Sequence, residues 1–107
     1  MIKKVFISIT FLIVASTFAF ANDEMCTDMS ELAASIMKAR QQGASMSLVI
    51  SAATKNLDDA TSAAIREIVI DAYNAKRWHS ESIQKRAIDD YRNKIFLLCI
   101  NSFDRNE

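Results

Sequence analysis

The residues of this chain best suited to chemistry are Cys26, Cys99 and His79, because they are its only two cysteines and its only histidine. Any serine–histidine or cysteine–histidine mechanism would therefore have to use His79. This histidine stands between Trp78 and Ser80, in a segment that we expect to connect two helices, and its simplest interpretation is a surface residue. A role in sensing pH or in contacting a partner is the alternative.

Other catalytic arrangements find little support in the sequence. The single glycine, Gly43, excludes the glycine-rich loops that hold phosphates in nucleotide-binding proteins. Carboxylates are frequent, but the adjacent pairs at 58–59 and 89–90 have no apolar surround that would tune one member for acid–base catalysis. We therefore expect that the protein is not an enzyme.

Met25, Cys26 and Met29 are soft ligands of the kind that bind Cu(I). A disulfide is a better use for Cys26, and Met29 falls on a predicted core face, where methionine is an adaptable filler. We expect no metal site and no cofactor.

A group of basic and aromatic residues precedes the last predicted helix and is the strongest candidate for a partner-binding site. It comprises Tyr73, Lys76, Arg77, Trp78 and His79. Trp, Tyr and Arg are the residue types that contribute most to binding energy in protein interfaces. Trp78 has a second interpretation, as a lid that folds over the end of the core, and the two roles are compatible.

The first 21 residues have the features of a secretory signal peptide. Lys3 and Lys4 give a positive start, residues 5–20 form an apolar run, and Ala19-Phe20-Ala21 has the small-x-small pattern that signal peptidase accepts. The run is shorter than the ~20 residues of a transmembrane helix. An uncleaved anchor and a lipoprotein are alternatives, although Cys26 lacks the small residues that should precede a lipidated cysteine. We expect cleavage after Ala21 and a periplasmic or secreted protein that meets the membrane only through this signal.

Export decides how the two cysteines are interpreted. In an oxidising compartment, Cys26 and Cys99 are expected to form one intramolecular disulfide. Closing so long a loop stabilises a domain by about 4 kcal/mol in the chain-entropy model, which matters for a small core. Two buried free thiols and an intermolecular bridge are the alternatives.

The mature chain, residues 22–107, is long enough for a single domain. Removal of the leader takes away two lysines and no acidic residue, so the net charge falls from zero to about −2. A slightly acidic domain lacks the basic surface of a nucleic-acid-binding protein. We expect no nucleic-acid partner.

The mature chain is predicted to be all-α, because it has no proline, one glycine and apolar residues that recur at intervals of three and four. Four helices are expected: from 27 or 28 to about 42, from about 45 to 55, from 59 to 75 and from 81 to 101. The predicted end signals are a capping box at Asp28 and Glu31, a left-handed Gly43, and N-caps at Ser45 or Ser47, Asp58 and Ser80.

Each predicted helix has one apolar face. The residues expected to face the core are Met29, Leu32, Ala33, Ile36, Met37, Met46, Val49, Ile50, Ala53, Ala64, Ile65, Ile68, Val69, Ala72, Tyr73, Ile83, Ala87, Ile88, Tyr91, Ile95, Phe96, Leu98, Cys99 and Phe103. The disulfide ties the start of the first helix to the end of the last, so these two helices should lie side by side and antiparallel in a compact array.

Three segments carry a family resemblance: Ser30-Glu31-Leu32-Ala33 through Arg40-Gln41-Gln42-Gly43, Ala72-Tyr73, and Gln84-Lys85-Arg86 through Tyr91-Arg92-Asn93 to Cys99. With them the chain resembles a group of small exported proteins common in proteobacteria and their phages and prophages, which as a group lack an assigned activity. The resemblance implies a bacterial or prophage setting and no catalytic residues. In size, leader, helicity and single disulfide the chain is more generally similar to the HdeA-type periplasmic acid-stress chaperones, from which its cysteine spacing departs.

These observations predict a non-enzymatic periplasmic module that binds an unidentified protein partner, as inhibitors and immunity proteins do. The partner would contact a helical face and the segment from Tyr73 to His79. An acid-stress chaperone that exposes apolar surface when its many carboxylates are protonated is the alternative.

Overall fold

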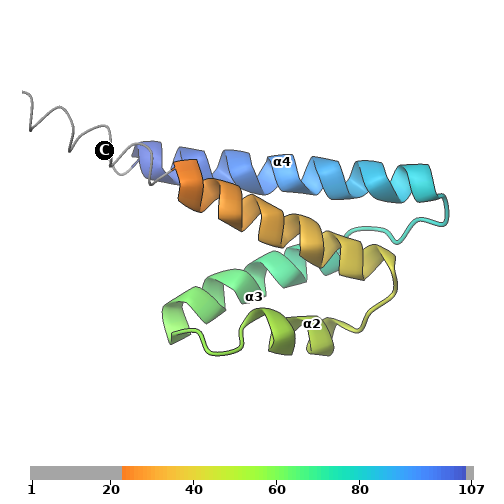
Figure 1. The fold of residues 1–107 in the computed structure, drawn as a ribbon, viewed down its shortest axis with the longest axis horizontal. Helices are drawn as coiled ribbons and strands as arrows, with labels where there is room; N and C mark the ends of the chain where they lie inside the picture. The colour runs from red at the N-terminus through yellow and green to blue at the C-terminus, as the bar shows by residue number, and fades with distance from the viewer. Residues whose placement is uncertain (1–22, 106–107) are drawn as a thin grey trace, which may run out of the picture.

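The computed structural model describes residues 23–105, and every regular element in this range is a helix (Figure 1). The described part of α1 covers 23–41, followed by α2 (Met46–Ala53), α3 (Asp59–Tyr73) and α4 (Glu81–Arg105). The predicted all-α class and the four helices are confirmed. The predicted leader, residues 1–21, lies outside the described residues. Within them, no helix is long and apolar enough to cross a membrane.

The ends of the helices follow the local signals closely. α1 ends in a Schellman motif, in which the amides of Gly43 and Ala44 donate to the carbonyls of Arg40 and Ala39, and Gly43 takes a φ of +86°. Ser45 caps α2 through its hydroxyl. One prediction is wrong: Asp28 and Glu31 form no capping box, because α1 is already helical from residue 23.

The start of α3 is set by Asp58, whose side chain accepts a hydrogen bond from the amide of Thr61 at 2.7 Å. This bond to the charged carboxylate lowers the pKa of Asp58. At the next helix start, Ser80 precedes α4, and its carbonyl accepts from the amide of Gln84. α4 continues to Arg105, one turn beyond the predicted end.

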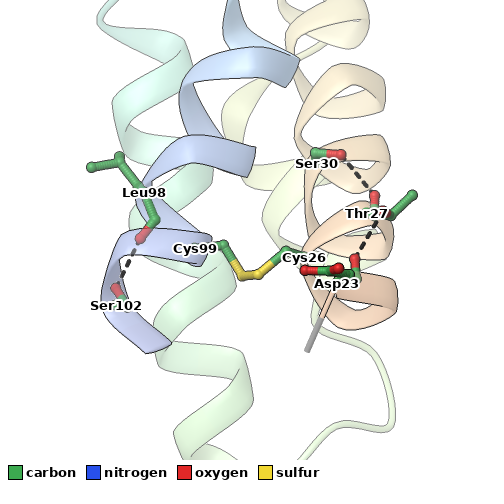
Figure 2. The surroundings of a disulfide bond; sticks show 7 residues. All are labelled: Asp23, Cys26, Thr27, Ser30, Leu98, Cys99 and Ser102. Atoms are coloured by element: carbon green, nitrogen blue, oxygen red, sulfur yellow. Dashed lines mark hydrogen bonds between the residues drawn. A yellow bond between two sulfur atoms is a disulfide. The ribbon is translucent and has the colours of Figure 1, made fainter. Parts of the chain in front are cut away.

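α1 and α4 pack most closely of the four helices and run antiparallel, as predicted (Figure 1). Cys26 and Cys99 form the disulfide between them, with their Cα atoms 5.5 Å apart (Figure 2). Ser30, one turn after Cys26 on α1, is buried and donates its hydroxyl to the carbonyl of Thr27 at 2.7 Å. Since the hydroxyl is satisfied within its own helix, its burial leaves no unpaired polar group near the disulfide.

The core lies where α1, α3 and α4 meet. It consists of Ala33, Ile36, Met37, Ile65, Val69, Ala72, Tyr91 and Ile95, all of which the sequence placed there. α2 has no buried residue and contributes only the half-buried Val49, Ile50 and Ala53, which pack against this core.

Five residues predicted to face the core are exposed instead: Met46, Ala64, Ile83, Phe96 and Leu98. Leu98 lies in the last part of α4, after the residues that contact α3. The hydrogen bonds between α3 and α4 involve Ile68 and Asp71, both in the second half of α3. The first half of α3 diverges from α4 (Figure 1) and leaves the end of α4 uncovered on that side.

Polar contacts between helices fix their relative positions. Tyr91 donates its hydroxyl to the carbonyl of Ile68 at 2.8 Å, and burial and the charge of Asp71 raise the pKa of Tyr91. Lys94 pairs with Asp71 at 2.9 Å. The ion pairs are exposed and stabilise the fold only slightly, so the disulfide and the apolar core hold the array together.

Candidate functional site at the connector between α3 and α4

The connector from 74 to 80 lies at the end of the molecule where α1 stops and α4 begins (Figure 1). The structure brings all five predicted residues, Tyr73, Lys76, Arg77, Trp78 and His79, to this end. It divides them into residues that hold the connector in place and residues that face solvent.

Gln41, in the last turn of α1, is the central holding residue. It is 1% exposed. Its Nε2 donates to the carbonyl of Lys76 at 2.8 Å, and its Oε1 accepts from the amide of Trp78 at 2.8 Å. One buried side chain therefore satisfies both a backbone acceptor and a backbone donor of the connector. The two partners also determine the positions of the oxygen and the nitrogen in the side-chain amide.

Sequence reasoning missed Gln41, although a signal was present. The residue follows Met37 by four positions and Ala33 by eight, so it continues the apolar stripe of α1. A polar residue in register with a core face needs a buried hydrogen-bond partner, and here the connector supplies two.

Arg40 and Tyr73 make a second attachment. The guanidinium of Arg40 donates to the carbonyl of Ala75 through Nε at 3.2 Å and through Nη2 at 3.1 Å, and it lies 5.3 Å from the centre of the Tyr73 ring. The hydroxyl of Tyr73 donates to the carbonyl of Ala44 at 2.7 Å. Tyr73 is therefore half-buried and serves the joint between α1 and α3.

Arg77 is used in the same way. Its Nε donates to the carbonyl of Gln41 at 3.0 Å, which places a cation at the carboxyl end of α1, where the helix dipole favours positive charge. The guanidinium lies directly over Gly43, and a Cβ added to Gly43 would stand 2.8 Å from its Cζ. The glycine is thus favoured by its backbone conformation, and a larger residue would in addition have to displace the flexible side chain of Arg77.

Lys76, Trp78 and His79 form the exposed part of the cluster. Trp78 is 36% exposed, and Nζ of Lys76 lies 4.5 Å from the centre of its ring. The carbonyl of Trp78 accepts a hydrogen bond from Nε2 of Gln84 on α4, so its backbone is bonded to side chains of both α1 and α4. Trp78 therefore combines a fixed backbone with an accessible ring, and His79 follows it on the surface.

A groove of about 410 Å³ runs beside the connector between α1 and α4. Gln41 and Gln84, which hold the backbone of Trp78, belong to its lining. The remaining lining residues are mostly polar or charged: Lys38, Gln42, Glu81, Lys85, Ile88, Asp89 and Arg92.

A second hollow, of about 270 Å³, lies between α1 and α2 and is lined almost entirely by apolar side chains. Its lining comprises Leu32, Ser35, Ile36, Ala39, Val49, Ala52 and Ala53. On α2, Leu48 is 68% exposed and Met46 is exposed as well. The methionines Met25, Met37 and Met46 could be expected from the sequence to line an adaptable groove if exposed; Met25 and Met46 are exposed, Met37 is buried, and the exposure of Leu48 was not predicted.

Cys26 is bonded to Cys99, so its sulfur is not a thiolate ligand for copper. Among residues 23–105, no three His, Cys, Asp or Glu side chains come together in a way that could hold a metal ion. Comparisons with protein-family models, with curated proteins and with solved structures give no match for the chain.

Proposed function

We propose that the chain is an exported, non-enzymatic protein-binding module that occludes a partner in the periplasm, in the manner of an inhibitor or an immunity protein. The observation that carries the proposal is the fixed presentation of Trp78. Its backbone is bonded to Gln41 and Gln84 while its ring stays accessible. An anchor that is already ordered loses little conformational entropy on binding, and tryptophan is the residue type most enriched among energetically important interface residues.

Export rests on the predicted leader and is consistent with the disulfide, because disulfides persist in oxidising compartments. Mass spectrometry of the protein purified from the periplasm tests this part. The mass expected is that of residues 22–107 with one disulfide. A mass that includes residues 1–21 would contradict cleavage after Ala21.

The binding role is tested by capture. The exported protein would be immobilised and exposed to periplasmic extract of the organism that encodes it, beside Trp78→Ala and the control Leu97→Ala. Leu97 is also an exposed apolar residue but lies in the second half of α4. We expect a stoichiometric partner that the wild type and the Leu97 variant retain and the Trp78 variant loses. Capture of no partner, or capture indifferent to Trp78, would count against the proposal.

A client-binding chaperone active in acid is the second candidate, and the apolar surface on α2 favours it. Apolar surface left without a covering element in a small protein indicates a contact with another molecule. Protonation of the carboxylates at about pH 3 would leave a strongly cationic chain and loosen the helices. Circular dichroism, dye binding and a client-aggregation assay at about pH 7 and pH 3 test this role. A chain that stays folded and binds no dye at about pH 3 would end it.

A further inference from the structure

The end of the molecule at the connector has an excess of basic side chains. We define the tip as residues 38–43 and 74–86, which carry the end of α1, the connector and the start of α4. The tip has one acidic residue, Glu81, against six basic ones: Lys38, Arg40, Lys76, Arg77, Lys85 and Arg86. At the disulfide end, residues 23–31 include four acidic residues, Asp23, Glu24, Asp28 and Glu31, and no basic one. A domain of slightly negative net charge therefore has a strongly positive end.

The positive charge of the tip is not neutralised within the described chain. The ion pairs among residues 23–103 join Arg92 to Glu31 and Asp89, and Lys94 to Asp71. None involves a cation of the tip. Arg40 and Arg77 donate to backbone carbonyls, and Lys76 stacks on Trp78.

Two of these cations, Lys38 and Lys85, line the groove beside the connector from opposite sides, one on α1 and one on α4. The carboxylate of Asp89, one turn after Lys85, is bonded to Arg92 at 2.6 Å, so it does not neutralise Lys85. Glu81 also lines the groove, one turn before Lys85, and forms no ion pair with either lysine in the described chain. The groove thus presents two ammonium groups without an ion-pair partner, and Gln41 and Gln84 of the same lining bind the backbone of Trp78.

We infer that the tip docks an acidic segment of a protein partner, with carboxylates of that segment against Lys38 and Lys85 and an apolar side chain against Trp78. This inference rests on the proposed binding function and names the chemistry of the partner. Positive and negative surfaces that match in this way accelerate association and exclude wrong partners.

The other lining groups favour a polypeptide over a lipid surface or a small anion. The side-chain amide of Gln42 is exposed and makes no hydrogen bond within the described chain, and Oε1 of Gln84 makes none while its Nε2 donates to the carbonyl of Trp78. Amide donors and acceptors match the alternating N–H and C=O groups of an extended peptide. A fully ionised phosphate offers only acceptor oxygens and would leave the oxygen of a side-chain amide without a donor. A bilayer surface cannot enter a groove between two helices.

The test uses the exported protein and a ten-residue peptide of glutamate and leucine, with the same peptide carrying glutamine for glutamate as its control. Trp78 is the only tryptophan, so its emission reports contact at the tip directly, and anisotropy of the labelled peptide gives the affinity. The protein variants are Lys38→Gln with Lys85→Gln and, matched in charge, Lys55→Gln with Arg66→Gln. Lys55 and Arg66 are exposed residues outside the tip.

We expect the glutamate peptide to change Trp78 emission and to bind about fivefold or more weakly to the Lys38/Lys85 variant, since each exposed charge pair contributes a modest amount. Affinity for the Lys55/Arg66 variant should stay within about twofold, and binding should weaken as the salt rises from about 0.05 to 0.5 M. Equal weakening in both variants, or equal binding of the glutamine peptide, would overturn the inference. Stronger binding of phosphatidylglycerol vesicles or of inorganic pyrophosphate would replace it by a lipid or a phosphate site.

Two further outcomes separate this inference from the proposed function. A partner captured through Trp78 could be retained equally at high salt and by the Lys38/Lys85 variant. This outcome would support the binding function and refute the inference that the partner docks through an acidic segment. Salt-sensitive self-association in light scattering, lost in the Lys38/Lys85 variant, would identify the acidic end of a second copy as the occupant instead.

Discussion

Replacement of Gln41 by methionine is the sharpest test of how the connector is held. Methionine has a similar length and volume, so Gln41→Met removes the amide and leaves little cavity. It deletes the hydrogen bonds to the carbonyl of Lys76 and to the amide of Trp78, both 2.8 Å long. It leaves the main-chain attachment through Arg77 in place, because that bond uses the backbone carbonyl of residue 41.

The expected magnitude follows from these two bonds. An intramolecular hydrogen bond contributes about 0.5–1.5 kcal/mol, and a buried partner left unpaired costs about 1–3 kcal/mol. The connector groups lie close to solvent, since Lys76 and Trp78 are exposed, so water takes up part of the loss. We therefore expect Gln41→Met to lower the free energy of unfolding by about 2–4 kcal/mol.

Guanidinium denaturation followed by circular dichroism measures this change, and Trp78 fluorescence shows whether the connector is released before the helices unfold. Gln42→Met is the matched control. Its side chain is exposed, so a change within about 0.5 kcal/mol is expected. If Gln41→Met changes the free energy of unfolding by no more than about 0.5 kcal/mol and leaves the emission of Trp78 unchanged, the side-chain amide of Gln41 does not hold the connector. The fixed position of Trp78 would then have another cause.

Three other perturbations have defined outcomes. Reduction of the bond between Cys26 and Cys99 should lower stability by about 2–5 kcal/mol, measured by thermal melts with and without reductant. Gly43→Ala should cost about 1–3 kcal/mol in urea, because the residue has a φ of +86° and its Cβ would displace the guanidinium of Arg77. Tyr91→Phe should cost about 1 kcal/mol near pH 7 through its lost hydroxyl bond. Because the folded-state pKa of Tyr91 is raised, its protonated hydroxyl stabilises the fold fully below about pH 10, and this contribution is lost as the pH rises further. The Phe variant should therefore show a shallower loss of stability in alkaline titrations, and an identical slope would contradict the role of Tyr91.

Local interactions explain why much of the fold was predictable. Gly43, Ser45 and Asp58 act within a few residues of their own positions, so their roles can be deduced from the neighbouring sequence. The disulfide was predictable from two cysteines and an expected oxidising compartment, and it implied the antiparallel contact of α1 with α4.

Features that depend on where one helix leaves another were not predictable. Periodicity identifies which residues of α4 lie on its apolar face. It does not show how many of them another helix covers, so Ile83 and Leu98 were wrongly placed in the core. The same limit applies to α2, whose apolar face meets the rest of the molecule only at its edge.

The candidate site was predicted in its residues but not in their division of labour. Sequence composition indicated an aromatic and basic cluster, and it could not distinguish Arg77, which caps α1, from Lys76, which stacks on Trp78 in solvent. The holding role of Gln41 spans more than thirty positions along the chain, and no local pattern specifies a contact of that range.

The bond between Cys26 and Cys99, with a sequence separation of 73, turns most of the described chain into a closed covalent ring. α2, α3 and all three connectors lie inside it. Exposed connectors such as the one that carries His79 are the positions where proteases cut most readily. A single cut there would release no fragment and would add only one water to the mass, and two cuts would be needed to detach any helix of the ring.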